Sequence, residues 1–174
     1  EIFTGVPKIF ITNDQRELEG LDLGNTFTGI FGKIEFSPTL DLILEQFPAT
    51  KRVVVITGSS IQDASYLDQA TRDFAAYSDR VEIVYLSGLS IPDLQRAVSS
   101  VPPDNVCLFI SYGRDPAGNG YSIPGAISML IPSAGVPMYA LADSAMGTGV
   151  VGGNMLSFEL MGSRAGELGL RILS

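Results

Sequence analysis

A tyrosine, an arginine and an aspartate follow one apolar segment closely enough to act on the same small molecule. Tyr112, Arg114 and Asp115 come directly after the apolar run 106–111. A guanidinium binds a carboxylate through paired hydrogen bonds, a carboxylate binds an ammonium group, and an aromatic ring covers an apolar body. The group therefore suits a small carboxylate or an amino-acid-like ligand. The alternative is an exposed Arg–Asp pair on a solvated loop.

Polar residues also end two other apolar segments. Asn13 and Asp14 end a segment near the start of the chain, and Asp143 and Ser144 end one in its last third. These side chains could close the same crevice from the opposite side. Asn and Asp are also ordinary turn formers after strands, so a plain turn is the alternative.

A glycine and two serines precede a helical pattern. Gly58, Ser59 and Ser60 could offer backbone N–H groups and hydroxyls to an anionic group at the start of that helix. The same residues also suit a turn followed by an N-cap, which needs no ligand.

Several chemistries have little or no support in the sequence. The chain has no histidine, so serine and cysteine triads lack their usual base and histidine metal sites are excluded. Cys107, the one cysteine, lies in an apolar run and is expected to be a buried, inert thiol. A hydrolase using Asp115 and Asp143 as a carboxylate pair is the catalytic rival, without a supporting motif. We expect no enzyme activity, no metal and no cofactor.

The glycines at 147, 149 and 152 match the pattern G-x-G-x-x-G, which is typical of dinucleotide-binding folds. That fingerprint requires a turn from a strand into a helix, with an acidic residue ending the following strand. Val150 and Val151 instead indicate a short extended segment, and Glu167 falls within the last helical pattern. We therefore expect a glycine-edged strand near a pocket.

The elements that must position these residues alternate regularly between strand and helix. Near-continuous apolar strands separated by amphipathic helices predict an α/β fold with a parallel sheet covered on both faces, and such sheets bind ligands at the carboxyl ends of their strands. Ser37 and Pro38 are expected to open a helix that ends at Pro48. The expected strands are 8–12, 28–34, 53–57, 81–86, 106–111 and 136–142, and the expected helices include 63–77, one opened by Ser90 and Pro92, and 157–173.

Composition indicates a globular chain that does not bind nucleic acid. Apolar residues make up 45% of the 174 residues, which supports a real core. The net charge is −8, and no Lys/Arg cluster occurs. Residues 116–142 carry no charge, but Pro124, Pro132 and Pro137 break the stretch into a loop, a short helix, a turn and a buried strand rather than a membrane span.

Taken in order, the segments resemble the type I periplasmic binding protein fold. More narrowly, they resemble the ABC-transporter substrate-binding-like modules that act as extracytoplasmic sensors of histidine kinases. The resemblance covers nearly the whole chain. It rests on the segments 6–14, 28–32, the helix ending at Phe47 and Pro48, 51–56, the strand at Val106, 136–143 and 149–153.

The resemblance implies two α/β lobes that close on a small ligand. Residues 49–136 would form the second lobe, and residues 1–48 plus 137–174 would form part of the first, with hinges near 48–51 and 135–137. Family members carry further residues upstream, so the first lobe should be incomplete and should expose apolar surface that favours self-association, for example as a homodimer. The implied ligand-binding positions are Asn13, Asp14, Ser59, Ser60, Tyr112, Arg114, Asp143 and Gly153.

The resemblance also implies a function. We expect the small-molecule-binding sensor part of a membrane-anchored signalling protein, a two-component histidine kinase, with lobe closure transmitted through the last helix. The alternative is the solute-binding protein of an ABC transporter. Because the chain begins with Glu1, we expect it to be part of a longer, extracytoplasmic polypeptide.

Overall fold

The computed structural model describes residues 5–13 and 18–174, which divide into two compact units. The larger unit is Glu35–Met155, and the smaller unit is Glu1–Ile34 with Leu156–Ser174. Each unit has its own sheet, and the two sheets share no strand.

The larger unit is built on a four-stranded sheet with the strand order β4-β3-β5-β6. All three strand pairings are parallel, as the alternating pattern predicts. Every residue of β5 is buried, which explains its uninterrupted apolar sequence, because both faces of the strand are covered. The strands are β3 (Arg52–Thr57), β4 (Glu82–Leu86), β5 (Val106–Ser111) and β6 (Met138–Ala140).

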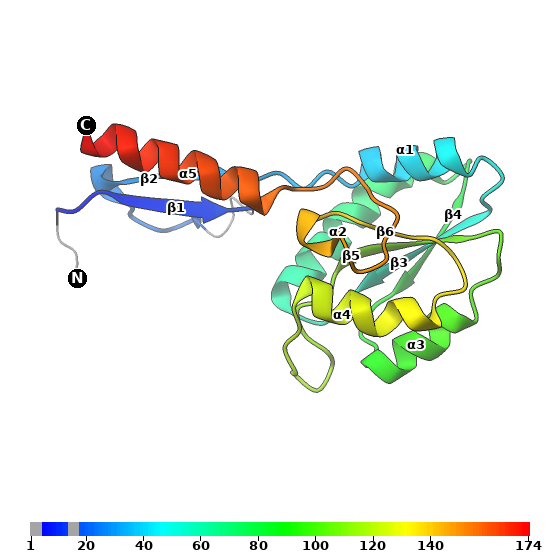
Figure 1. Cartoon of the computed structure of the whole chain (residues 1–174). Helices are drawn as coiled ribbons and strands as arrows, with labels where there is room; N and C mark the ends of the chain where they lie inside the picture. The colour runs from blue at the N-terminus through cyan, green and yellow to red at the C-terminus, as the bar shows by residue number, and fades with distance from the viewer. Residues whose placement is uncertain (1–4, 14–17) are drawn as a thin grey trace. The chain divides into compact units, whose positions relative to one another are not determined.

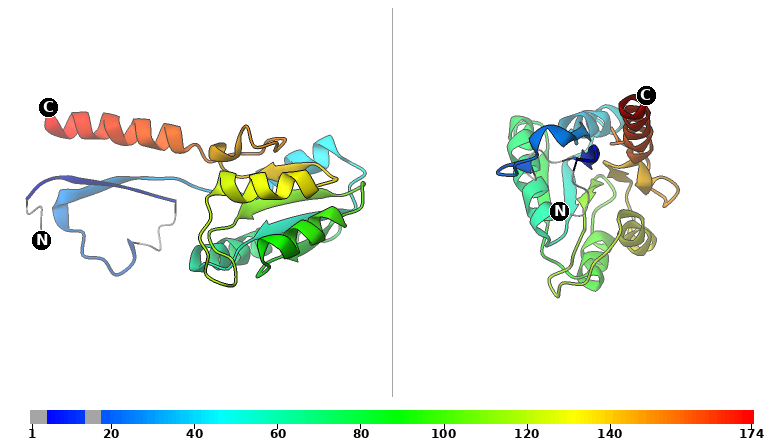
Figure 2. Two further views of the ribbon diagram at one scale, coloured as in Figure 1. Left: turned by 60° about the horizontal axis from the view of Figure 1, so that its bottom comes forward. Right: turned by 90° about the vertical axis from the view of Figure 1, so that its left-hand side faces the viewer.

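Helices cover both faces of this sheet (Figures 1 and 2). Val54, Cys107 and Phe109 belong to one core cluster with residues of α3 and α4. On the other face, Phe36 makes edge-to-face ring contacts with Tyr66 and Phe74 of α2. The helices of this unit are α1 (Ser37–Gln46), α2 (Ile61–Phe74), α3 (Ile91–Ser99) and α4 (Ile123–Leu130), with short 3₁₀ helices η3 (Ala75–Tyr77), η4 (Ile131–Ser133) and η5 (Asp143–Ala145).

Serine N-caps set where α2, α3 and α4 begin. The side chains of Ser60, Ser90 and Ser122 each accept a hydrogen bond from the backbone N–H three residues later. Helix α1 differs from these: Ser37, expected to open it as an N-cap, is its first helical residue, and Phe36 occupies the cap position without a side-chain hydrogen bond.

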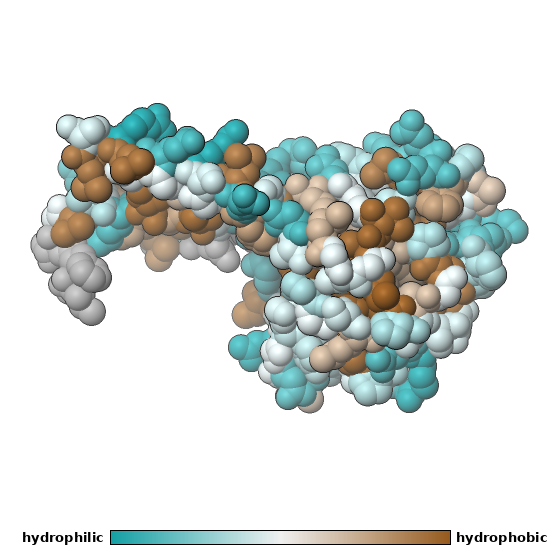
Figure 3. All heavy atoms as spheres, in the orientation of Figure 1, coloured by the Kyte–Doolittle hydropathy of each residue, from teal (hydrophilic) through white to brown (hydrophobic). Residues whose placement is uncertain are grey.

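The smaller unit pairs two strands in parallel beneath one helix. Strand β1 (Lys8–Thr12) pairs with β2 (Phe27–Phe31), and α5 (Phe158–Leu173) packs against both. Gly29 leaves room for the ring of Phe10, which a Cβ there would overlap. A short 3₁₀ helix, η2 (Gly24–Thr26), precedes β2. Figure 3 shows apolar atoms on the visible surface of α5, where Leu160, Leu170 and Leu173 are exposed.

The boundaries between the units differ from those of the predicted lobes, 1–48 plus 137–174 and 49–136. Strand β6 belongs to the larger unit because it pairs with β5, with Leu108 opposite Tyr139. Helix α1 belongs there too, because the Tyr139 hydroxyl donates to the side chain of Gln46 and the Asn154 N–H donates to the hydroxyl of Thr39 at 2.9 Å. Residues 35–48 and 137–155 therefore move to the larger unit, and the chain passes between units at 34/35 and 155/156.

The uncharged stretch 116–142 folds as the proline positions predict. It forms a loop, α4, η4 and the buried strand β6. Over residues 5–13 and 18–174, no helix combines the length and the apolar character needed to cross a membrane.

Candidate functional site

The turns that follow β3, β4, β5 and β6 lie at one edge of the sheet, because parallel strands end on the same side. We call residues 58–60, 87–90, 112–115 and 141–144 at this edge the carboxyl edge. It holds most of the predicted ligand-binding residues of the larger unit. They are Ser59, Ser60, Tyr112, Arg114 and Asp143.

The turn after β3 is bonded directly to the loop after β5. The Gly58 N–H donates to the carbonyl of Ser111 at 3.0 Å, and the Ser59 N–H donates to the carbonyl of Arg114 at 2.8 Å. The β3–β5 register also shifts at the end of β3, as strands often do beside a functional site. Ser59 is exposed, so its hydroxyl lies at the surface while its backbone is fixed.

A buried carboxylate that the sequence analysis missed holds this junction together. Asp63 in the first turn of α2 is 1% exposed. Its oxygens accept hydrogen bonds from the Ser111 hydroxyl at 2.7 Å and from the N–H groups of Ser60 (2.8 Å), Gly113 (3.0 Å) and Arg114 (3.3 Å). The spacing Ser60-x-x-Asp63 signalled a helix cap, but nothing local signalled the bonds to the loop after β5.

Hydrogen bonding keeps Asp63 ionised. Burial of the carboxylate acts to raise its pKa, but the bonds from Ser111, Gly113 and Ser60 outweigh burial and leave the pKa below its ordinary value. The negative charge is thus stabilised by oriented donors rather than by a basic side chain.

The donors of the turn after β3 are already used within the protein. Ser60 and Asp63 form a reciprocal capping box, in which the Ser60 hydroxyl accepts from the Asp63 N–H at 3.0 Å. The N–H groups of Gly58 and Ser59 are bonded to carbonyls of the neighbouring loop. The turn-and-cap alternative therefore describes these backbone groups, and the Ser59 hydroxyl is the donor that this turn leaves at the surface.

Arg114 offers the accessible positive charge of the carboxyl edge. The residue is exposed, and its guanidinium makes one long hydrogen bond, from Nη1 to the Gly118 carbonyl at 3.4 Å. The backbone N–H and carbonyl of Arg114 are bonded to Asp63 and Ser59, so the side chain extends from a fixed backbone position.

Asp115 closes the loop instead of forming the exposed Arg–Asp pair considered above. It is 6% exposed and accepts hydrogen bonds from the N–H of Asn119 at 2.9 Å, from its side-chain amide at 2.8 Å and from the Tyr121 hydroxyl at 3.1 Å. The bonds from Asn119, and the weaker one from Tyr121, lower the pKa of Asp115 against the effect of desolvation. Asp115 therefore shapes the loop that carries Arg114.

Tyr112 is a core residue. The residue is 1% exposed, and its hydroxyl donates to the Leu89 carbonyl at 2.7 Å. Its ring lies edge-on to the ring of Tyr121, with the ring centroids 5.3 Å apart. Burial, with the negative charge of Asp115 nearby, raises the pKa of Tyr112 to about 12. The hydroxyl of Tyr112 thus links the loop after β5 to the turn after β4, and the buried ring offers almost no surface with which to cover a ligand.

The predicted residues not yet described are Asn13, Asp14, Asp143 and Gly153. Asn13 follows β1 in the smaller unit, and Asp14 lies outside the described residues. Asp143 begins η5 directly beyond β6 and is half-buried. Gly153 runs beside the end of β6, where a Cβ would overlap the carbonyl oxygen of Ala140. Gly153 is therefore required by close packing of two backbones.

The segment with the G-x-G-x-x-G pattern runs alongside β6, but Val150 and Val151 do not form the strand that was expected there. The Val151 N–H donates to the carbonyl of Met138 at 2.8 Å, and the Ala140 N–H donates to the carbonyl of Gly152 at 3.0 Å. No helix starts within the pattern, so it does not form a strand-to-helix phosphate turn.

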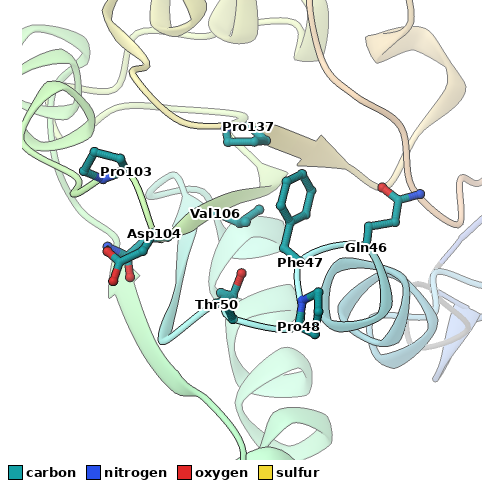
Figure 4. A pocket seen from close by; sticks show the side chains of 10 residues that line it. Gln46, Phe47, Pro48, Thr50, Pro103, Asp104, Val106 and Pro137 are labelled. Carbon is teal, nitrogen blue, oxygen red and sulfur yellow. The ribbon is translucent and has the colours of Figure 1, made fainter.

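Two cavities lie away from the carboxyl edge. One of about 270 Å³ lies at the opposite, amino edge of the sheet and is lined by residues that include Phe47, Pro103 and Pro137 (Figure 4). The other, of about 390 Å³, lies in the smaller unit between residues 25–28 and α5. Neither is lined by a predicted ligand-binding residue.

Three ionisable groups at or beside the carboxyl edge have pKa values shifted away from neutral pH. Asp63 and Asp115 are carboxylates with lowered pKa values, and Tyr112 is a phenol with a raised one. Burial also raises the pKa of the Cys107 thiol to about 12, and the side chain is fully buried, as predicted. Asp63 and Asp115 therefore stay ionised and Tyr112 stays protonated near neutral pH.

Comparison with known proteins identifies the fold. No protein-family model matches the chain, and no curated protein matches it. The solved structures that are similar to this chain include the following two. One is the ligand-free, open form of a substrate-binding protein with adhesive properties from Clostridium difficile, with a TM-score of 0.66 and 16% identity over 97% of this chain and 57% of that one. The other is a conserved domain protein from Vibrio cholerae, with a TM-score of 0.61 and 20% identity over 86% of this chain and 49% of that one.

The likeness confirms the predicted fold class. The chain spans about half the length of both solved structures. At these identities the likeness concerns the fold, which is α/β with parallel sheets flanked by helices, consistent with the two-lobed periplasmic-binding-protein type.

Proposed function

We propose that this chain binds a small carboxylate-bearing solute at the carboxyl edge of its larger unit, as part of an extracytoplasmic two-lobed binding protein. The observation that carries the proposal is the exposed guanidinium of Arg114 on a backbone fixed by Asp63 and Ser59. The likeness to a substrate-binding protein supports it, because ligands of such sheets bind outside the carboxyl ends of the strands.

The residues around Arg114 suggest a solute with both a charged and an apolar part. Ser59 offers a hydroxyl beside the arginine. Ile61, the first residue of α2, comes two residues after Ser59 and is 93% exposed, so its hydrocarbon side chain is accessible. A guanidinium for a carboxylate and an isoleucine for a hydrocarbon body match a small amphipathic acid, including amino-acid-like molecules.

Two biological settings fit this binding function. The substrate-binding neighbour favours a solute-binding protein of an ABC transporter. The sensor part of a two-component histidine kinase, anchored in the membrane, rests on the sequence resemblance alone. The coding sequence downstream of Ser174 separates the settings, because a membrane span followed by a kinase supports the sensor and a stop codon supports the transporter protein.

We also propose that the chain leaves its ligand chemically unchanged. Asp115 of the carboxyl edge and the adjacent Asp63 are ionised and Tyr112 is protonated, and general acid–base catalysis favours groups that titrate near the working pH. Mass spectrometry of the recovered ligand after prolonged incubation tests this proposal, and a converted product would overturn it.

Thermal-shift screening of the 174-residue chain tests the binding proposal. The panel contains amino acids, nucleobases and small carboxylates, each acid being matched with its neutral amide. We expect selected acids to raise the unfolding temperature and their amides to have little effect, because a ligand at about a hundred times its Kd stabilises the native state by about 2.7 kcal/mol. Equal effects of acid and amide, or no stabilisation by any acid, would contradict the proposal.

A further inference from the structure

Two helices of the larger unit begin with the same local pattern. Helix α2 follows Ser60 and has Asp63 as its third residue, and α3 follows Ser90 and has Asp93 as its third residue. In each, the serine hydroxyl accepts from the aspartate N–H, at 3.0 Å in α2 and 3.3 Å in α3. Capping a helix is therefore a task that the two aspartates share.

Asp63 makes contacts that capping does not require. Asp93 keeps 43% of its side chain exposed and pairs with Arg96 on its own helix. Asp63 is 1% exposed and accepts hydrogen bonds from Ser111, Gly113 and Arg114, all from the end of β5 or the loop after it. Burying a carboxylate is costly unless its oxygens are bonded, so an aspartate that only capped a helix would stay at the surface.

We propose that Asp63 is a positioning residue for the ligand site, which fixes the place from which Arg114 reaches the ligand. This inference rests on the proposed solute-binding function. Asp63 of α2 accepts from the N–H of Arg114, and the Ser59 N–H in the turn after β3 donates to its carbonyl, so both backbone groups of Arg114 are fixed. The ligand would then order only the arginine side chain, which lowers the entropic cost of binding.

The geometry leaves little room for another arrangement. A Cβ on Gly58 would lie 2.5 Å from an oxygen of Asp63 and 2.7 Å from the carbonyl of Arg114, and one on Gly113 would lie 3.1 Å from the Ser60 hydroxyl. Glycines thus allow the two backbones to close around the carboxylate. The donors around Asp63 require an acceptor-only side chain, because an amide N–H₂ in place of one oxygen would face N–H and O–H groups.

The test compares Asp63→Asn with Asp93→Asn, which alters the same position of the neighbouring helix. Amide hydrogen exchange by NMR reports directly on the hydrogen bonds from the N–H groups of Gly113 and Arg114 to Asp63. We expect Asp63→Asn to accelerate exchange at Gly113 and Arg114 by roughly tenfold or more relative to Val55 in the core of the sheet, and to weaken binding of the best acid from the screen by roughly tenfold or more. Asp93→Asn should leave the exchange at Gly113 and Arg114 and the affinity within about twofold of wild type.

A milder variant keeps the test decisive if Asp63→Asn does not fold. Ser111→Ala removes one donor to Asp63 without altering the helix cap, and it should produce a smaller change in the same direction in both measurements. The proposal is overturned if a folded Asp63→Asn variant leaves the exchange at Gly113 and Arg114 unchanged. If that variant is unfolded, unchanged exchange in Ser111→Ala overturns it. Faster exchange with unchanged affinity would confine Asp63 to a structural role. If wild type binds no acid, the proposed function fails, and the exchange measurement still decides whether Asp63 orders the loop.

Discussion

The backbone N–H of Ser59 donates to the carbonyl oxygen of Arg114 at 2.8 Å and thereby joins the turn after β3 to the loop after β5. The N–H of Arg114 donates in turn to Asp63, so the arginine is held at both of its backbone groups. Its side chain remains exposed, with one long bond to Gly118. This combination of a fixed backbone and a free cationic side chain is what makes Arg114 the centre of the candidate site.

Replacing Arg114 by alanine should weaken binding strongly. Losing a desolvated, charge-assisted pair typically costs about 2–5 kcal/mol, whereas losing a solvated surface charge costs about 0–1 kcal/mol. Calorimetry with the best acid from the screen should therefore show an affinity loss of roughly 30-fold or more for Arg114→Ala. Arg72→Ala, at an exposed arginine in the last turn of α2, is the matched control and should bind like wild type. A loss below about fivefold, with the fold intact by circular dichroism, would show that Arg114 is a solvated loop residue that does not pair with the ligand.

Adding one methyl group at Gly58 should destabilise the protein. The new Cβ would meet Asp63 and the backbone of Arg114, both held in place, and overpacking of this kind typically costs about 1–3 kcal/mol. Urea unfolding of Gly58→Ala should show that loss, together with weaker ligand binding. Gly135→Ala is the control, because nothing lies within 4 Å of its Cβ position, and its stability should stay close to that of wild type. Equal stabilities of the two variants would mean that the junction adapts easily.

Acid should destabilise the larger unit through Asp63 and Asp115. Both have folded-state pKa values below the ordinary value, so each contributes stability that is present above the unfolded-state pKa of about 3.9 and is lost as the pH falls through the folded-state pKa. The free energy of unfolding should therefore fall below about pH 5. Asp63→Asn should be less stable at neutral pH and should decline less steeply in acid. A variant whose urea-unfolding profile parallels that of wild type down to about pH 3 would show that Asp63 contributes no such linkage.

The smaller unit should promote self-association. A parallel sheet normally has both faces covered, and here a two-stranded sheet packs beneath a single helix among the described residues. Ile11 and Phe31 on its strands are each 48% exposed. We expect sedimentation to show concentration-dependent association that Phe31→Ser weakens. A monomer at high concentration would mean that this apolar surface needs no partner.

Local patterns predicted most of the elements, because they depend on neighbouring residues. The apolar run 106–111 became β5 with its predicted bounds, since a strand buried on both faces needs apolar residues throughout. Ser90 and Pro92 opened α3 as expected, because a serine cap and an early proline act within one turn. The position of Arg114 at a strand's carboxyl end followed from the same local reasoning.

Local patterns were thus enough to predict the alternation of strands and helices, the parallel sheet and the edge that holds the candidate site. They did not predict that β6 and α1 join the larger unit, that Tyr112 is buried, or that Asp63 holds the loop of Arg114. These features depend on residues that lie far apart along the chain. The bond between Asp63 and Ser111 spans 48 residues, and no local periodicity records which distant donors will surround a carboxylate once the strands are paired.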